Sequence, residues 1–199
     1  MQPVERVISF VLAIEDLKRV TRKVRPLGLD RYENSAEHSW QLALFAYALA
    51  PHAGFALDLD RVIRMLLVHD LGEIDTGDTM AFVEGGWEQR KADELAAVKR
   101  IFSLLPDGQA AELLQLWQEF ETGTTPEARF ANAVDRAMPV LLNLNNHGQS
   151  WRENDISYER ILKRVRGQIL EGCPQLWDYL ETRLSEARES GFFDWDAGS

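Results

Sequence analysis

Four side chains that could bind a metal ion lie in three separate segments of the chain. His38 occupies the first segment, the adjacent pair His69 and Asp70 the second, and Asp135 the third. Imidazole nitrogens and carboxylate oxygens are good ligands for divalent Mn, Co, Ni, Zn or Fe. A His-Asp dipeptide is also common by chance, and a histidine at a helix end can be an ordinary core residue. The residue types alone therefore leave a metal site and a structural role open.

The other two of the four histidines lie too far along the chain to share one ion with these residues. His52 follows His38 by 14 residues, which is about 21 Å on a continuous helix. His147 follows Asp135 by 12 residues and is likewise too far away on a continuous helix to bind the same ion. We expect both histidines at the surface or at helix ends.

The elements that position the candidate ligands are expected to be helices. Nearly every periodic segment has apolar residues three and four apart, and no run alternates convincingly at the period of a strand. This pattern predicts an all-α fold in one compact domain. The expected helices cover about residues 4–20, 35–50, 61–69, 88–105, 109–121, 126–144, 158–170 and 174–189. The inner stripe of the first is expected to be Val7, Ile8, Val11, Ile14 and Leu17.

Local signals place the candidate ligands at irregular points of these helices. Asn34 or Ser35, together with Glu37, resembles a capping arrangement just before the first histidine. The nearly apolar run Val62–Val68 predicts a buried central helix whose end carries the His-Asp pair. Pro139 removes a backbone hydrogen bond one turn after the last aspartate and predicts a kink there. Such irregular backbone lets side chains from different helices converge.

Composition and charge limit the partners. The 199 residues are 45% apolar and 27% charged, as in a globular protein, and no apolar run reaches the roughly 20 residues that span a bilayer. A formal charge of −10 repels polyanions, so we expect no nucleic-acid polymer as a partner. The single cysteine, Cys173, excludes an intrachain disulfide and favours a reducing cytoplasm. No signal-peptide pattern is present, which also favours a cytoplasmic location without membrane attachment.

The candidate ligands form the pattern H…HD…D, and the residues around them strengthen it. The matching stretches are ENSAEHS at 33–39, LVHDLGEIDTGD at 67–78 and ANAVDR at 131–136. In order and separation they resemble the HD-domain superfamily of metal-dependent phosphohydrolases, and most closely its small 5'-deoxynucleotidase-like branch. The resemblance extends over most of the chain. It implies one HD domain over residues 1–199, with a core at about 4–145 and C-terminal helices at about 156–189.

The resemblance also implies roles for individual residues. In such enzymes the H, HD and D residues bind one divalent metal ion, a glutamate and an aspartate assist catalysis, and an arginine contacts the nucleotide phosphate. These roles correspond here to His38, His69, Asp70 and Asp135 for the metal, Glu73 and Asp78 for catalysis, and Arg22 for the phosphate. Two-metal members have extra histidines between the HD pair and the last aspartate; this chain has none, which indicates one ion.

Some features depart from the pattern of the branch or leave a structural role open. Lys23 stands where the best-studied type of the branch has a tryptophan, so the sugar and base preference stays open. Asp75, in the same acidic stretch as Glu73 and Asp78, is expected only to cap or solvate a loop. Gly72 and Gly77 would let a ligand approach the backbone of that loop.

The expected activity is hydrolysis of a small phosphorylated metabolite, most plausibly a nucleoside 5'-monophosphate, through water activated by one Mn, Co, Mg, Zn, Ni or Fe ion. A phosphodiesterase or guanosine-tetraphosphate-type hydrolase is an alternative, and so is a non-catalytic metal-containing nucleotide sensor or scaffold. Dimers are common in the resembling branch, so a homodimer is expected. Its interface is expected among the aromatic residues Trp117, Trp151, Trp177, Phe192, Phe193 and Trp195.

Overall fold

The computed structural model describes residues 2–82 and 85–194. Within these ranges the chain forms helices joined by loops and has no strand beyond an isolated bridge between Thr21 and Asn34. The predicted all-α fold is therefore confirmed. None of the helices in the described part is both long and apolar enough to cross a membrane.

The helices follow the predicted order with some differences at their ends. In chain order they are α1 Pro3–Ala13, the 3-10 helix η1 Ile14–Arg19, α2 Ser35–Leu49, the 3-10 helix η2 Ala50–His52, α3 Leu59–Val68, α4 Glu73–Thr76, α5 Trp87–Phe102, α6 Asp107–Thr122, α7 Pro126–Asn145, α8 Gln149–Glu153, α9 Tyr158–Gly172 and α10 Pro174–Glu189. The short helices α4 and α8 were not predicted, because one helical turn is too short to show a period.

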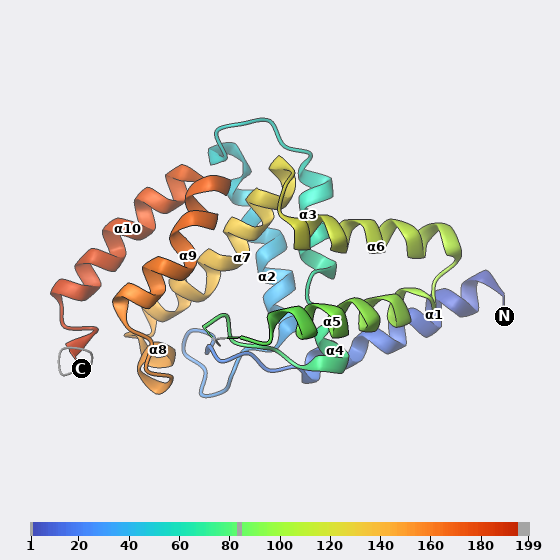
Figure 1. Ribbon diagram of the computed structural model, residues 1–199, viewed down its shortest axis with the longest axis horizontal. Coiled ribbons are helices and arrows are strands. Elements are labelled where there is room, and N and C mark those ends of the chain that lie inside the picture. Colours follow the sequence, from blue (N-terminus) through green and yellow to red (C-terminus); the bar gives the residue numbers. More distant parts are fainter. Residues whose placement is uncertain (1, 83–84, 195–199) are drawn as a thin grey trace.

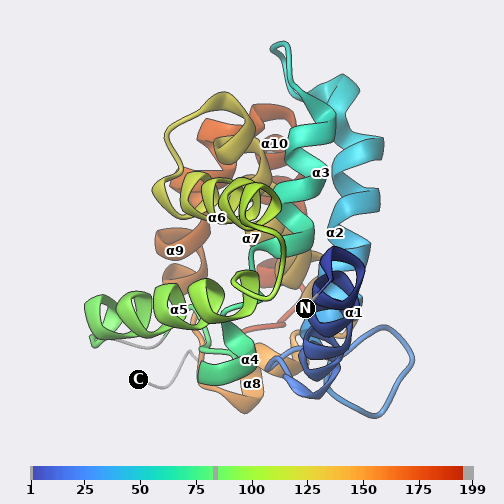
Figure 2. The same cartoon turned by 90° about the vertical axis from the view of Figure 1, so that its right-hand side faces the viewer.

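Helix α7 is the central element of the fold. It packs against α2, α3, α6, α9 and α10, and Figure 1 shows it running between α2 and α9. Phe130 and Val134 on α7 are fully buried, and the helix continues through Pro139. The sequence predicted α3 in this role, but Leu67 of α3 is 47% exposed. Figure 2 shows why: α3 lies beside α2 at the edge of the molecule, so only part of its surface is covered.

The N-terminal helix differs from the prediction in length and in its buried face. Regular α-helix ends at Ala13 and continues as η1, and both Ile8 and Val11 are at least half exposed. The predicted inner stripe is therefore wrong at these two positions. The contact with the rest of the molecule runs instead through Phe10, whose ring lies 6.5 Å from that of Phe102, and through buried Leu17.

The aromatic residues expected at a dimer interface belong to the core. Trp117, Trp151 and Trp177 are all at least 96% buried. Phe193 is also buried, and its ring stacks on Trp151 with centroids 5.4 Å apart. The expectation of an interface at these residues is wrong, because large aromatic side chains fill the space between α7 and the C-terminal helices. Trp195 lies outside the described residues.

A glycine permits the close crossing of α7 and α9. A Cβ atom on Gly172 would lie 2.7 Å from the Cβ of Ala133 and would also clash with the carbonyl oxygen of Arg129. We expect Gly172→Ala to lower the free energy of unfolding by about 3 kcal/mol, measured by urea unfolding, because the helices would have to move apart. Gly167→Ala on the same helix meets no atom within 4 Å and is expected to be neutral or slightly stabilising. Equal effects of the two substitutions would contradict this packing.

Candidate metal centre

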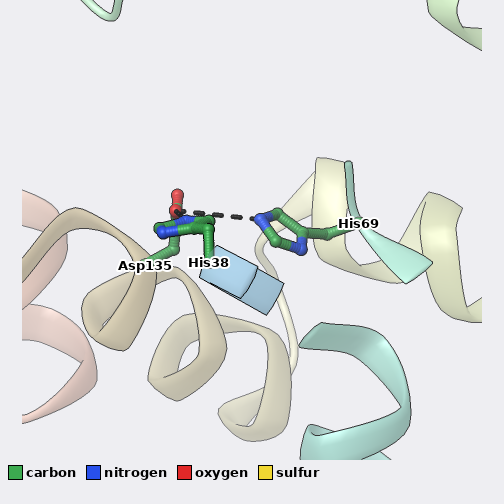
Figure 3. A group of neighbouring side chains, drawn as sticks. All are labelled: His38, His69 and Asp135. Carbon is green, nitrogen blue, oxygen red and sulfur yellow. Dashed lines mark hydrogen bonds and ion pairs between the residues drawn. The ribbon is translucent and has the colours of Figure 1, made fainter. Parts of the chain in front are cut away.

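Two histidines and one aspartate converge where α2, the end of α3 and α7 meet. One ligand atom from each of His38, His69 and Asp135 lies within 4.8 Å of the others, and all three residues are buried. Figure 3 shows both rings facing Asp135, whose Oδ1 lies 3.1 Å from the Nε2 of His38 and 3.8 Å from the Nε2 of His69. The structure thus brings together residues that are 97 positions apart in the sequence.

A hydrogen bond from Nδ1 of His69 orients the other ring nitrogen, Nε2, toward this cluster. Its Nδ1 donates to the carbonyl oxygen of Leu66 at 2.8 Å, which leaves Nε2 without a proton in the neutral ring. This buried Nε2 has no hydrogen-bond partner among the described residues, yet it lies 3.0 Å from Oδ1 of Asp70. A lone pair and a carboxylate oxygen at that distance repel each other unless a proton or a metal ion lies between them. The donor set therefore fits a divalent metal ion.

The charges of the carboxylates agree with this arrangement. Burial would lower the pKa of His69, but with no ion bound Asp70 and Asp135 outweigh it and raise the pKa, so a proton and a metal ion compete for Nε2. Burial would raise the pKa of Asp70, but His69 and Arg22 lower it to about 2. Burial would also raise the pKa of Asp135, but Arg136, His38 and His69 hold it below its usual range. Both aspartates are therefore ionised at neutral pH and able to act as ligands.

A buried glutamate, which the sequence analysis did not assign to the site, supports His38 from behind. Oε2 of Glu33 lies 3.2 Å from Nδ1 of His38, and Glu33 is 1% exposed. A metal-binding histidine commonly donates its other ring N–H to a carboxylate, which fixes the ring. Glu33 is the carboxylate beside His38, at ion-pair distance but outside hydrogen-bond geometry. Glu33 can reach His38 because α2 begins at Ser35 with the predicted capping box between Asn34 and Glu37.

Arg22 lies inside the cluster of carboxylates. Its Nη1 donates to Oδ2 of Asp70 at 2.9 Å and lies 3.8 Å from Oδ1 of Asp78, while its Nε lies 3.5 Å from Glu33. Burial would lower the pKa of Arg22, but Asp70, Asp78, Asp135 and Glu73 outweigh it and raise the pKa. The guanidinium is therefore always charged, and it offsets part of the negative charge around the centre.

The two candidate catalytic carboxylates lie close to the ligands but have different electrostatics. Glu73, on α4, accepts a hydrogen bond from Oγ of Ser35 at 2.8 Å. Burial and the charge of Asp70 raise its pKa well above the usual range, and burial also raises the pKa of Asp78. Asp75, between them in sequence, is partly exposed and pairs with Arg100 on α5, as expected for a residue outside the site. Burial thus favours the protonated forms of Glu73 and Asp78, which suits groups that hold and transfer protons.

A cavity of about 810 Å³ adjoins the ligands and has a size typical of small-molecule sites. Arg22, Asp70, Glu73, Asp78 and Asp135 line it at the metal centre. Its wall also includes Lys23, the residue at the position where the resembling branch has a tryptophan. The other basic residues of the wall are Lys91, Arg136, Arg160, Lys163 and Arg164. The contribution of Arg164 was not predicted, because an arginine on an exposed-looking helix face carries no sequence signal for a cavity.

The two remaining histidines are exposed and make other contacts. Nδ1 of His52 lies 3.2 Å from Oε1 of Gln175, and the ring of His147 packs 5.6 Å from that of Phe192. The prediction from spacing that both lie at the surface is confirmed.

Comparisons with known proteins agree with the fold and the centre. A model of the HD domain family matches residues 14–177. The human protein "5'-deoxynucleotidase HDDC2" is 31% identical over 135 residues, which cover 67% of this chain and 65% of the human protein. The chain thus spans less than two thirds of that relative's length.

Solved structures extend the likeness to the whole described fold. A protein from Magnetospirillum magnetotacticum MS-1, described as a "Predicted metal-dependent phosphohydrolase", is 38% identical with a TM-score of 0.91, and the match covers 96% of this chain and 95% of that one. An HD-domain phosphohydrolase from Listeria innocua has the same fold at 19% identity, with a TM-score of 0.62 over 89% of this chain and 99% of its own.

Proposed function

We propose that this chain, which belongs to the HD domain family, is a metal-dependent phosphomonoesterase that hydrolyses nucleoside 5'-monophosphates. The proposal draws on the relatives named as 5'-deoxynucleotidases and on the relative described as a metal-dependent phosphohydrolase. The observation that carries it is the convergence of Nε2 of His69, Nε2 of His38 and the carboxylates of Asp70 and Asp135 at the edge of a cavity of about 810 Å³. We propose His38 as the fourth ligand of a single divalent ion.

The chemistry of the proposed reaction divides between the ion and the surrounding residues. A bound divalent ion would polarise the phosphoryl oxygens and lower the pKa of a water molecule. In the hydrolysis, the water oxygen forms a bond to phosphorus, the bond from phosphorus to the 5' oxygen breaks, and the nucleoside leaves as an alcohol. Two proton movements are required: one from the water and one to the leaving oxygen.

The protein's own residues can perform these movements. Asp78, beside Arg22 at the cavity wall, is placed to orient the water and take its proton. Glu73, whose pKa is raised by burial and by Asp70, holds a proton that it can deliver. Arg22 supplies fixed positive charge to the phosphoryl group, because its guanidinium lies among the ligands and lines the cavity.

Metal removal and replacement tests this function. We expect protein treated with a chelator to release no phosphate from AMP or dAMP, and re-addition of Mn²⁺, Co²⁺ or Mg²⁺ to restore release, as measured by a phosphate assay. Absence of release from a panel of ribo- and deoxyribonucleoside monophosphates with every ion would disprove the proposal. Hydrolysis of bis(p-nitrophenyl) phosphate in preference to the monoesters would identify a phosphodiesterase instead.

We also propose a homodimer, through a surface other than the one expected from the sequence. Trp40, Leu44 and Tyr47 lie at helical spacing on α2, and each is more than half exposed. An apolar strip of this kind is typical of a surface covered by another molecule. Light scattering that gives the mass of one chain at micromolar concentration would exclude the dimer.

A further inference from the structure

The cavity has a second group of positive side chains beyond the metal centre. The residues of α7 and α9 that line it include four basic side chains and one acidic side chain among the described residues. The basic ones are Arg136, Arg160, Lys163 and Arg164, and the acidic one is Asp135. The whole chain has ten more acidic than basic residues, so this local excess opposes the overall charge. A wall of one sign in a concave site attracts ligands of the other sign.

Arg136 and Arg164 line the same cavity, and both carry positive charge there. Burial, and after it the charge of Arg136, disfavours the charged form of Arg164, and the two effects lower the pKa of Arg164 to about 10. The negative charge of Asp135 favours the charged form of Arg164, and its Oδ2 also lies 3.8 Å from Nη1 of Arg136. Its Oδ1, however, faces His38, His69 and Arg22. One shared carboxylate does not neutralise two guanidinium groups.

The same wall has polar atoms that the protein leaves unsatisfied. Nε of Arg136 is buried and has no hydrogen-bond partner among the described residues, so it is free to donate to an anion. Oε1 of Gln168, one turn after Arg164 on α9, is also buried without a partner, but this carbonyl oxygen requires a donor and not a phosphate oxygen; all three residues line the cavity. Arg164 itself is held in place, since its Nε donates to the carbonyl oxygen of Ala81 at 2.8 Å. Uncompensated charge and unsatisfied polar atoms at a fixed position indicate that a polar ligand belongs there.

We propose that Arg136 and Arg164 form a second anion-binding subsite for a second phosphate on the sugar of the substrate, which is then a nucleoside bisphosphate. The inference rests on the proposed phosphomonoesterase function. Two guanidinium groups match the oxygens of a phosphate, which arginine can bind in a bidentate way. A single carboxylate, Asp135, contacts both the metal centre and Arg136. A phosphate held at Arg136 would lie next to the metal centre, so we expect the two anionic groups of the substrate to be a few bonds apart, as two phosphates on one sugar are.

The test compares one and two phosphates on the same nucleoside. We expect adenosine 2',5'-bisphosphate or adenosine 3',5'-bisphosphate to have a kcat/KM at least about tenfold above that of AMP, since a charge-assisted contact is worth at least that factor. In Arg164→Gln this ratio should fall to about one. Arg166→Gln is the matched control, because Arg166 is an exposed arginine on the same helix that does not line the cavity, and it should keep the wild-type ratio.

Two results would overturn the subsite: neither bisphosphate exceeds AMP in the wild-type protein, or the advantage survives in a folded Arg164→Gln variant. If Arg164→Gln does not fold, by circular dichroism, Arg136→Gln, which removes the other guanidinium of the subsite, provides the comparison. If no nucleotide is hydrolysed, the proposed function fails, and calorimetric binding to the Mn²⁺-loaded protein tests the subsite alone. Tighter binding of a bisphosphate than of AMP, lost in the variant, supports it; equal binding refutes it.

Discussion

Replacing His69 by glutamine is expected to remove both the metal ion and the activity. The glutamine amide cannot reproduce the imidazole Nε2 that faces Asp70 and Asp135, so the two carboxylates would remain without a nitrogen ligand between them. Metal analysis should show less than about a tenth of the wild-type content. Phosphate release should fall about 1000-fold, because the ion is worth several kcal/mol of transition-state stabilisation.

A matched substitution separates this effect from the loss of any histidine. His52→Gln changes an exposed histidine that contacts Gln175, far from the cavity residues, and is expected to keep metal content and turnover. Circular dichroism should show a folded His69→Gln protein, since its backbone carbonyl still accepts the hydrogen bond from Trp117. A His69→Gln variant with a full complement of metal and wild-type turnover would rule out His69 as a ligand.

The sequence identified side chains that converge at the candidate metal centre better than it located the surrounding helices, for a physical reason. Ligand chemistry restricts the centre to histidine and carboxylate, and the chain has few histidines, so the candidates His38, His69 and Asp135 were few from the start. Helix-capping residues also act locally, which is why the predicted capping box between Asn34 and Glu37 agrees with the structure.

Properties that depend on packing could not be predicted from one sequence. The period of α1 shows an amphipathic helix but not which of its apolar residues meet the rest of the chain, so Ile8 and Val11 were misplaced. Glu33 is one carboxylate among 32 acidic residues, and only the fold shows that it supports His38. Arg164 reaches the cavity because α9 packs closely on α7 at Gly172, a contact between distant parts of the chain.

A different outcome is expected when the candidate catalytic carboxylates are neutralised. Asp78→Asn and Glu73→Gln should each keep the metal ion, because none of the four proposed ligands changes. They should also fold normally, since burial already raises the pKa of both groups and so disfavours their charged forms in the folded protein. Turnover should nevertheless fall by about 10²- to 10⁴-fold in each, the usual contribution of a positioned acid or base. Metal analysis beside a phosphate-release assay measures both effects.

Asp75→Asn is the control for these two variants, and it makes the comparison decisive. Asp75 lies between Glu73 and Asp78 in sequence, but its carboxylate pairs with Arg100 on α5, away from the ligands. The control should therefore keep turnover within about twofold, as surface ion pairs contribute little. Metal loss in Asp78→Asn would make Asp78 a ligand instead of a proton acceptor. Wild-type turnover in both Asp78→Asn and Glu73→Gln would show that neither carboxylate takes part. A selective loss in one of them would assign the proton transfer to that residue, because the ion and the fold are the same in all three proteins.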